Sequence, residues 1–196
     1  MTDKADNKKR ADADTLIPTD GLQFKRGKRN VILLSVGSYA PVHINHVAMC
    51  ESAREHVQLD QQQHYVATFL APTSEAKAQS KLKPRDRLFA SLEMRVTLLK
   101  LAAEGTAIRV TTWAAVNDSP AALGMNELKN AVHRAFDAWL LAERVDADAA
   151  SAPTSLQCLS LFGVDGLERI KSARALSNAI VVLNRTVPGV DPFKLL

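Results

Sequence analysis

The stretch Val31-Ile32-Leu33-Leu34-Ser35-Val36-Gly37-Ser38-Tyr39-Ala40-Pro41-Val42-His43-Ile44-Asn45-His46 decides the fold of this chain. Its first six residues form a largely apolar run, which is typical of a strand buried on both faces of a sheet. Gly37 permits a tight turn after this strand, and Pro41 fixes the backbone before the next element. Apolar residues at helical spacing follow. The stretch therefore predicts a buried strand, a short loop and a helix that covers the sheet.

The rest of the chain repeats this alternation of strand and helix. Further strands are predicted over residues 65–70, 107–113, 156–161 and 179–183, and helices around residues 47–57, 88–103, 126–139 and 167–176. The alternation predicts an α/β fold, a Rossmann-like open parallel sheet of about five strands with helices on both faces. The first 29 residues are polar and lack apolar periodicity, so we expect a disordered basic tail over residues 1–29 and one domain over residues 30–196.

The composition is that of one globular domain, with 46% hydrophobic and 23% charged residues in a chain of 196. Its apolar runs are far shorter than the ~20 residues of a membrane helix, and no signal peptide opens the chain. We therefore expect no membrane partner and a cytoplasmic or nuclear location. The two cysteines, Cys50 and Cys158, lie in apolar contexts without metal-ligand spacing, so we expect buried free thiols and no metal site.

The net charge of +4 suits anionic ligands, although much of the excess lies in the basic clusters at residues 8–10 and 25–29. A solvated, mobile tail is the simpler interpretation of these clusters, and a nuclear-import signal or a phosphate-attracting arm is the alternative. Because only 5% of the residues are aromatic, the composition does not favour nucleic-acid binding.

Candidate binding residues follow from the predicted topology, because ligands of open α/β sheets bind beyond the carboxyl ends of the strands. The residues that follow the five predicted strands are Gly37, Ser38, Tyr39, His43 and His46 after the first, Lys77 and Lys81 after the second, Trp113 after the third, Gly163 and Asp165 after the fourth, and Arg185 after the fifth. The two histidines are three residues apart, so both lie on one side of a first helical turn, where free N–H groups stabilise a phosphate. The chain has neither a GxGxxG nor a GxxxxGK[ST] motif, which argues against a dehydrogenase and a kinase.

Each candidate also has a purely structural interpretation. Trp113 is more typical of a packing residue than of a platform for a base, and the lysines of the second loop are ordinarily solvated. A Gly-x-Asp sequence such as Gly163 to Asp165 is often only a turn with a helix N-cap. The strand-to-helix context of His43 and His46 favours the functional interpretation for that pair.

The loop after the first strand resembles the GSF-x-P-x-[TH]-x-x-H signature of the adenylyl- and cytidylyltransferase superfamily, and more narrowly the eukaryotic nicotinamide/nicotinate mononucleotide adenylyltransferases. Other motifs of that family have similar counterparts in the same order. They are Phe69-Leu70-Ala71-Pro72 before a basic loop, Arg95 with Leu98 to Ala102, Val110-Thr111-Thr112-Trp113, Phe162-Gly163-Val164-Asp165, and Val181-Val182-Leu183-Asn184-Arg185. The similarity extends from about Val31 to Asp191.

The resemblance implies an enzyme in which the 5′-phosphate of nicotinamide or nicotinate mononucleotide attacks the α-phosphorus of ATP. The products would be NAD or deamido-NAD and pyrophosphate, with Mg²⁺ bound through the ATP phosphates. Gly37 and Ser38 would present backbone groups to phosphates, and Tyr39 would belong to the nucleotide site. Of the two catalytic residues, His46 would hold the α/β-phosphate region of ATP, and His43 would occupy a position that is often Thr. Gly163 and Asp165 would meet the ribose, and Arg185, Lys77, Lys81 and Trp113 would complete the nucleotide site.

The chain departs from the family pattern after Trp113, where Ala114 to Pro120 replace an E-x-x-Q-x-x-W-x-x-T stretch. An N-L-W stretch is missing after the fourth-strand motif, and the sequence reaches Leu196 without the family's I-S-S-T-x-x-R segment, so we expect a C-terminally abbreviated domain. Three interpretations stay open. An adenylyltransferase is favoured over a divergent relative that only binds nucleotides or proteins, and over a nucleotidyltransferase for another phosphate such as phosphopantetheine or phosphocholine. A homo-oligomer also stays open.

Overall fold

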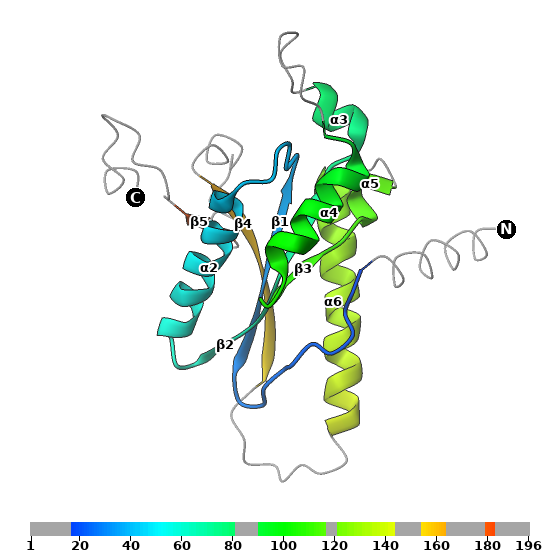
Figure 1. Ribbon diagram of the computed structural model, residues 1–196. Helices are drawn as coiled ribbons and strands as arrows, with labels where there is room; N and C mark the ends of the chain where they lie inside the picture. The colour runs from blue at the N-terminus through cyan, green and yellow to red at the C-terminus, as the bar shows by residue number, and fades with distance from the viewer. Residues whose placement is uncertain (1–16, 81–89, 117–120, 144–153, 164–178, 183–196) are drawn as a thin grey trace, which may run out of the picture.

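The computed structural model describes residues 17–80, 90–116, 121–143, 154–163 and 179–182. It contains a five-stranded parallel sheet in the order β3-β2-β1-β4-β5 (Figure 1). The strands are β1 (Arg29–Gly37), β2 (Gln63–Pro72), β3 (Ile108–Val110), β4 (Ser155–Gly163) and β5 (Ala179–Val182). The chain therefore has the predicted Rossmann-like α/β fold.

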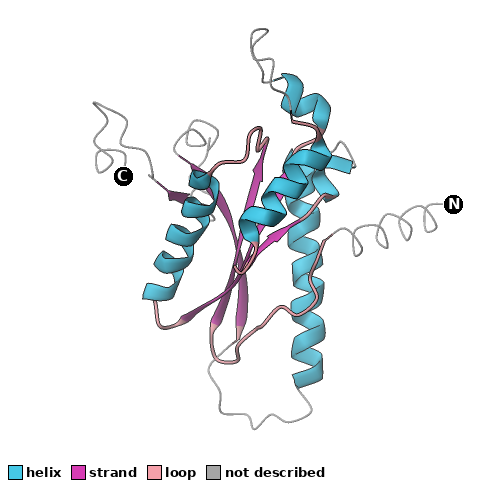
Figure 2. Ribbon diagram, viewed as in Figure 1, coloured by secondary structure: helices cyan, strands magenta, loops and turns pink. Residues whose placement is uncertain are grey.

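The helices cover both faces of the sheet (Figure 2). One face carries α2 (Ile44–Leu59) and α4 (Leu92–Ala103), and the other carries α5 (Trp113–Val116) and α6 (Ala121–Glu143). A further short helix, α3 (Glu75–Ser80), follows β2 at the carboxyl edge of the sheet. This arrangement confirms the prediction of helices on both faces.

The central strand β1 is buried on both sides, as its apolar run predicts. Val31 and Leu33 pack into the cluster beneath α2 and α4, whereas Ile32 and Leu34 pack into the cluster beneath α6. All four side chains are fully buried. Each contributes roughly 1.5–3 kcal/mol of hydrophobic stabilisation. Strand β1 therefore contributes side chains to two hydrophobic cores, one on each face of the sheet.

The segment before β1 is packed rather than disordered from residue 17 onwards, which differs from our expectation for residues 17–29. Ile17 and Leu22 are buried in the cluster on the α6 face. Phe24 lies against two aromatic rings of α6, with ring centroids 5.2 Å from Phe136 and 5.5 Å from Trp139. These anchors have no regular spacing, so periodicity could not reveal them. Residues 1–16 lie outside the described part of the chain.

The basic cluster at residues 25–29 belongs to a hydrogen-bonded turn, so its interpretation as part of a mobile tail was wrong. The buried amide of Asn30 accepts a hydrogen bond from the Lys25 N–H at 2.7 Å. Its Nδ2 group donates to the carbonyls of Lys25, Lys28 and Ser155 at 3.0, 3.2 and 3.3 Å. One side chain thereby ties the turn to the start of β4.

Several element boundaries differ from those predicted. The third strand ends at Val110 rather than at Trp113, which instead begins α5. The helix α6 begins at Ala121, so it starts earlier than the helix predicted around residues 126–139. Gly105 has a positive φ of 72° directly after the C-cap of α4, as expected of a helix terminator. The helix predicted around residues 167–176 lies outside the described residues.

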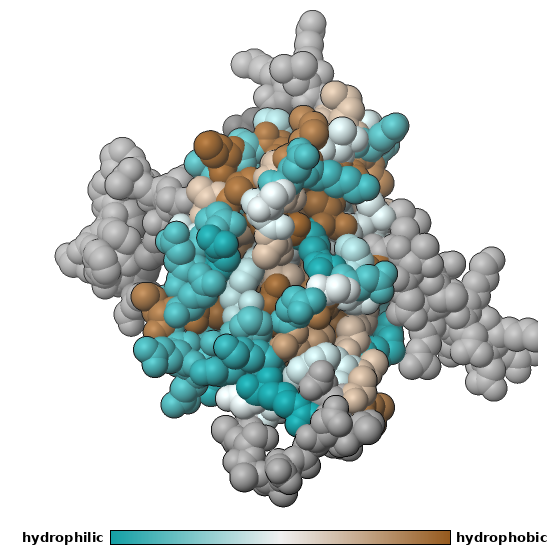
Figure 3. Space-filling model, turned by 60° about the horizontal axis from the view of Figure 1, so that its bottom comes forward, coloured by the Kyte–Doolittle hydropathy of each residue, from teal (hydrophilic) through white to brown (hydrophobic). Residues whose placement is uncertain are grey.

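No helix among the described residues combines the length and the apolar character needed to cross a membrane. In the space-filling view, hydrophilic residues predominate at the lower left, and hydrophobic residues gather near the top (Figure 3). Large apolar side chains are exposed at Met94, Leu98 and Leu101, three positions that lie on one side of α4.

Candidate functional site

The carboxyl ends of the central strands meet at one edge of the sheet. Gly37, the last residue of β1, pairs with Pro72, the last residue of β2. The N–H of Thr73 then donates a 2.9 Å hydrogen bond to the Gly37 carbonyl, so the loops after both strands start side by side. On the other side of β1, Leu34 pairs with Ser160, and each strand continues three residues further, to Gly37 and Gly163. The structure therefore brings Gly37 and Gly163 to the same edge, as the topology rule predicts.

Tyr39 turns the first loop back onto the sheet. Its φ of 49° lies in the left-handed region, which costs a non-glycine residue of the order of 1 kcal/mol or more. The side chain is only 3% exposed, and its hydroxyl donates to the Ser35 carbonyl at 3.2 Å. Burial strongly raises the pKa of this phenol, an effect that the hydrogen bond to Ser35 opposes, so it stays protonated. A ligand would reach the backbone of Tyr39 rather than its ring.

Gly37 is needed because the Tyr39 ring lies against it. A Cβ atom at residue 37 would be 3.0 Å from Cζ of the ring. The glycine therefore permits a close approach between strand end and ring, not a positive φ. The peptide bond between Ala40 and Pro41 is cis.

The two histidines lie at the first turn of α2, as the sequence predicted. His43 is the N-cap of the helix, with an extended backbone, and His46 is its third residue. Their rings stack with centroids 3.8 Å apart, and the edge-to-face contact between Tyr39 and His46 measures 4.9 Å. His43 is exposed, whereas His46 is partly buried between His43 and the buried tyrosine. The Tyr39 ring thus packs against His46, and the His46 ring packs against the exposed ring of His43.

A backbone hydrogen bond fixes the proton arrangement of His46. The His43 N–H donates to Nδ1 of His46 at 3.2 Å, and the His46 N–H donates to the His43 carbonyl at 2.9 Å. Because Nδ1 accepts a hydrogen bond, the neutral ring carries its proton on Nε2. The imidazole can therefore donate a hydrogen bond through Nε2. A donor at a helix N-terminus favours the binding of an anion.

A buried arginine connects the first loop with the second. Nη1 of Arg95 donates to the Ser38 carbonyl at 2.7 Å and to the Thr73 carbonyl at 2.9 Å. Its Nε donates to the Ala90 carbonyl at 3.2 Å. The side chain is 0% exposed, and burial lowers the pKa of its guanidinium, an effect that the nearby Glu75 charge opposes. Arginine nevertheless stays charged at every physiological pH, so this edge of the sheet carries a buried positive charge.

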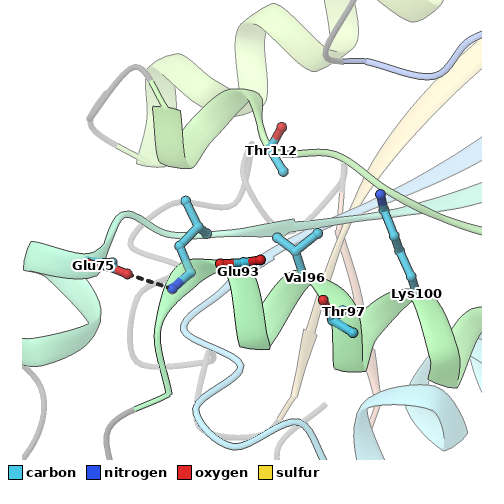
Figure 4. A pocket seen from close by; sticks show the side chains of 7 residues that line it. Glu75, Glu93, Val96, Thr97, Lys100 and Thr112 are labelled. Carbon is cyan, nitrogen blue, oxygen red and sulfur yellow. Dashed lines mark hydrogen bonds between the residues drawn. The ribbon is translucent and has the colours of Figure 1, made fainter.

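An open hollow of about 510 Å³ lies beside these loops. Figure 4 shows Glu75, Glu93, Val96, Thr97, Lys100 and Thr112 around it; Leu92 also lines it. The Glu75 carboxylate accepts a 2.7 Å hydrogen bond from the Leu92 N–H, which ties α3 to the start of α4. Its lining carries charges of both signs, with carboxylates at Glu75 and Glu93 and an ammonium group at Lys100.

The remaining predicted site residues have varied positions. Lys77 lies in α3 and is partly buried, close to the edge where β2 ends. Trp113 is 5% exposed and packs into the core cluster on the α6 face, the face opposite α2. This position agrees with the packing interpretation of Trp113 and leaves little of its ring for a base. Lys81, Asp165 and Arg185 lie outside the described residues.

Two polar residues of this edge were not predicted as site residues, Thr73 and Arg95. In the sequence, Arg95 was assigned only to a family-like motif. A stronger signal was present, because Arg95 lies one turn from both Leu92 and Leu99, on the apolar side of its helix. A charged residue on the buried side of a helix needs a polar partner inside the protein. Thr73 gave no such signal, since its role depends on a backbone carbonyl.

The described residues contain no group of three or more His, Cys, Asp or Glu side chains that could hold a metal ion. No known family model matches the chain, and no curated protein matches it either.

Proposed function

We propose that this chain is an adenylyltransferase that joins ATP to nicotinamide or nicotinate mononucleotide. The observation that carries the proposal is the position of His46. It lies at the first turn of α2, directly after the Gly37-to-Pro41 loop, and its Nδ1 accepts a hydrogen bond from the His43 N–H. In the neutral ring this leaves the proton on Nε2. A phosphate beyond the carboxyl end of β1 would meet this donor together with the first N–H groups of the helix.

The proposed reaction needs positioning and charge neutralisation rather than a covalent intermediate. An oxygen of the mononucleotide 5′-phosphate forms a bond to the α-phosphorus of ATP while the bond from that phosphorus to the β-phosphate bridging oxygen breaks. Pyrophosphate leaves with the electron pair. The Nε2 proton of His46 would stabilise the α-phosphate, and Mg²⁺, bound through the ATP phosphates, would supply charge neutralisation.

Further residues support this assignment in weaker ways. Gly37 and Ser38 would offer backbone groups to phosphate, and the buried charge of Arg95 lies directly behind the same loop. Lys77 lies near the edge where β2 ends. Gly163 ends β4 beside β1, where the ribose would bind together with Asp165.

A second candidate function is nucleotide binding without transfer. The observation that favours it lies after Trp113, where Ala114 and Ala115 are buried in α5. These small side chains cannot supply the polar and aromatic contacts to a pyridine ring that the family's longer motif implies. A nucleotidyltransferase with another phosphate acceptor is the third interpretation of the same edge.

A coupled assay separates these functions. The full chain is incubated with ATP, Mg²⁺ and either mononucleotide, and NAD formation is followed through a dehydrogenase that consumes only NAD, with deamido-NAD detected by chromatography. Formation of either dinucleotide, abolished by leaving out the mononucleotide, supports the proposal. ATP binding by calorimetry without any product supports the binding module. If neither product nor binding is found with folded protein, both functions are wrong.

A further inference from the structure

Arg95 joins three segments of the chain that are distant in sequence. Its hydrogen bonds run to Ala90 before α4, to Ser38 in the loop after β1, and to Thr73 in the loop after β2. All three acceptors are backbone carbonyls, so the contacts fix the path of the main chain. A backbone hydrogen bond from Thr73 to Gly37 joins the same two loops at 2.9 Å. The guanidinium is therefore the centre of a hydrogen-bond network at the carboxyl edge of the sheet.

This arrangement is a poor way to obtain stability alone. Desolvating a charged group is costly, and an apolar side chain of similar volume in the same place often gives an equally stable protein. Among the described residues no carboxylate forms an ion pair with Arg95, and its partners are neutral carbonyls. What a guanidinium adds is geometry, because its planar fork holds several acceptors in a fixed arrangement.

The same site has hydrogen-bond donors that remain unpaired. Nη2 of Arg95, Oγ of Ser38 and Oγ1 of Thr73 are buried and have no hydrogen-bond partner among the described residues. Each of these groups can donate a hydrogen bond, so the region behind the loop is rich in donors and carries positive charge. Such a region stabilises an anion that binds on the outer side of the loop.

We propose that Arg95 is a positioning residue for phosphate binding, which holds the Gly37-to-Pro41 loop and the Thr73 loop in one fixed arrangement. It acts through the backbone of these loops and does not itself contact the ligand. The class of ligand, the phosphate oxyanion of a nucleotide, rests on the proposed function. We call the link that Arg95 makes between these two loops the clamp. The evidence for the clamp is the pair of hydrogen bonds from Arg95 to the Ser38 and Thr73 carbonyls, and it does not depend on the proposed function.

The chain offers a matched control for this inference in Arg109. Its Nη1 also donates to two backbone carbonyls, those of Pro18 at 2.8 Å and Asp20 at 2.6 Å. Burial lowers the pKa of both guanidinium groups. Arg109, however, ties down the segment before β1 and not the loops at the carboxyl edge. Arg95→Lys and Arg109→Lys therefore remove the same fork geometry from two different places.

Amide hydrogen exchange of the ligand-free protein tests the clamp directly. We expect the amides of His46 and Thr73 to exchange about tenfold faster or more in Arg95→Lys, because the two loops open more often. In Arg109→Lys these amides should be unchanged, while amides of residues 17–24 exchange faster. If exchange at His46 and Thr73 is the same in Arg95→Lys as in the unchanged protein, there is no clamp.

Titration with Mg-ATP then tests the consequence for binding. We expect Arg95→Lys to bind Mg-ATP about tenfold more weakly, equivalent to about 1.4 kcal/mol, and Arg109→Lys to stay within about twofold of the unchanged protein. Adding millimolar guanidinium to Arg95→Ala should restore slow amide exchange at Thr73, whereas adding ammonium should not. If Arg95→Ala does not fold, the results with Arg95→Lys decide the question. Equal Mg-ATP affinity in both lysine variants overturns the positioning role. If the unchanged protein does not bind Mg-ATP, the proposed function fails, and the exchange data still decide on the clamp.

Discussion

The backbone N–H of His43 donates a 3.2 Å hydrogen bond to Nδ1 of His46, while the rings of the two residues stack with centroids 3.8 Å apart. The first turn of α2 therefore sets both the tautomer and the orientation of His46. A side chain that is oriented before a ligand arrives loses less entropy on binding. This relationship distinguishes the roles of the two histidines, since His43 contributes its backbone N–H and its ring, and His46 contributes the donor.

Replacing His46 should reduce catalysis far more than stability. If Nε2 of His46 stabilises the α-phosphate in the transition state, His46→Ala should cost about 2.7–4 kcal/mol, or roughly a hundred- to a thousandfold in turnover. His43→Thr should have a milder effect, because threonine is a good N-cap and keeps the N–H that binds Nδ1. His56→Ala, on the exposed side of the same helix, is the control and should leave turnover unchanged. Turnover of His46→Ala equal to that of His56→Ala in the dinucleotide assay would remove His46 from the mechanism.

Replacing Gly37 should disturb the first loop through Tyr39. In Gly37→Ala the new Cβ meets the Tyr39 ring at 3.0 Å, so the ring or the strand end must shift, at a cost of about 1–3 kcal/mol. The double variant Gly37→Ala with Tyr39→Leu removes the ring atoms and should be less destabilised than the sum of both single variants. Urea denaturation of the unchanged protein, the two single variants and the double variant measures this coupling free energy. Simple additivity would contradict the assigned contact.

The segment before β1 should be essential for stability. Ile17 is completely buried beneath α6, so Ile17→Ala should lower the free energy of unfolding by about 2–5 kcal/mol. The matched control is Ile44→Ala on α2, where the side chain is 82% exposed and the change should stay within about 0.5 kcal/mol. Chemical denaturation measures both. Equal effects of the two substitutions would show that residues 17–24 do not pack as described.

Stability should fall when the solution becomes alkaline. Burial raises the pKa of Cys50 from 9.0 to about 12 and that of Cys158 from 9.0 to about 11. The folded protein then keeps protons that the unfolded chain has released, so this stability is fully present below about pH 9 and is lost as the pH rises toward the folded values. The free energy of unfolding of Cys50→Ala should depend less steeply on pH above 9 than that of the unchanged protein. Identical slopes would mean that the Cys50 thiolate is not disfavoured by folding.

The parts of the fold that could be predicted are those in which local pattern and tertiary environment agree. The apolar run of β1 predicts a strand buried on both faces, and Val31 to Leu34 are indeed divided between two cores. The third strand was predicted too long because Thr111 and Trp113 suit a strand locally. In the structure the chain leaves the sheet after Val110, and Trp113 packs into the core from α5.

The candidate site could be predicted only where it lies in a contiguous loop. Gly37, His43 and His46 follow one strand, so the topology rule selects them from the sequence. The clamp made by Arg95 depends on contacts with residues 57 and 22 positions away, which no local pattern encodes. The same limit applies to the segment before β1, whose anchors join residues on β3 and α6 to an irregular stretch of chain.

The position of β1 at the centre of the sheet has a consequence for synthesis on the ribosome. Its two neighbours are made at very different times, since Leu34 pairs with Phe69 of β2 on one side and with Ser160 of β4 on the other. A nascent chain can cover the first edge early, but the second edge stays open until more than half of the protein has followed. An open edge of an apolar strand is a template for pairing with other chains. The interval between the emergence of β2 and that of β4 is therefore when the nascent chain is most exposed to pairing with other chains.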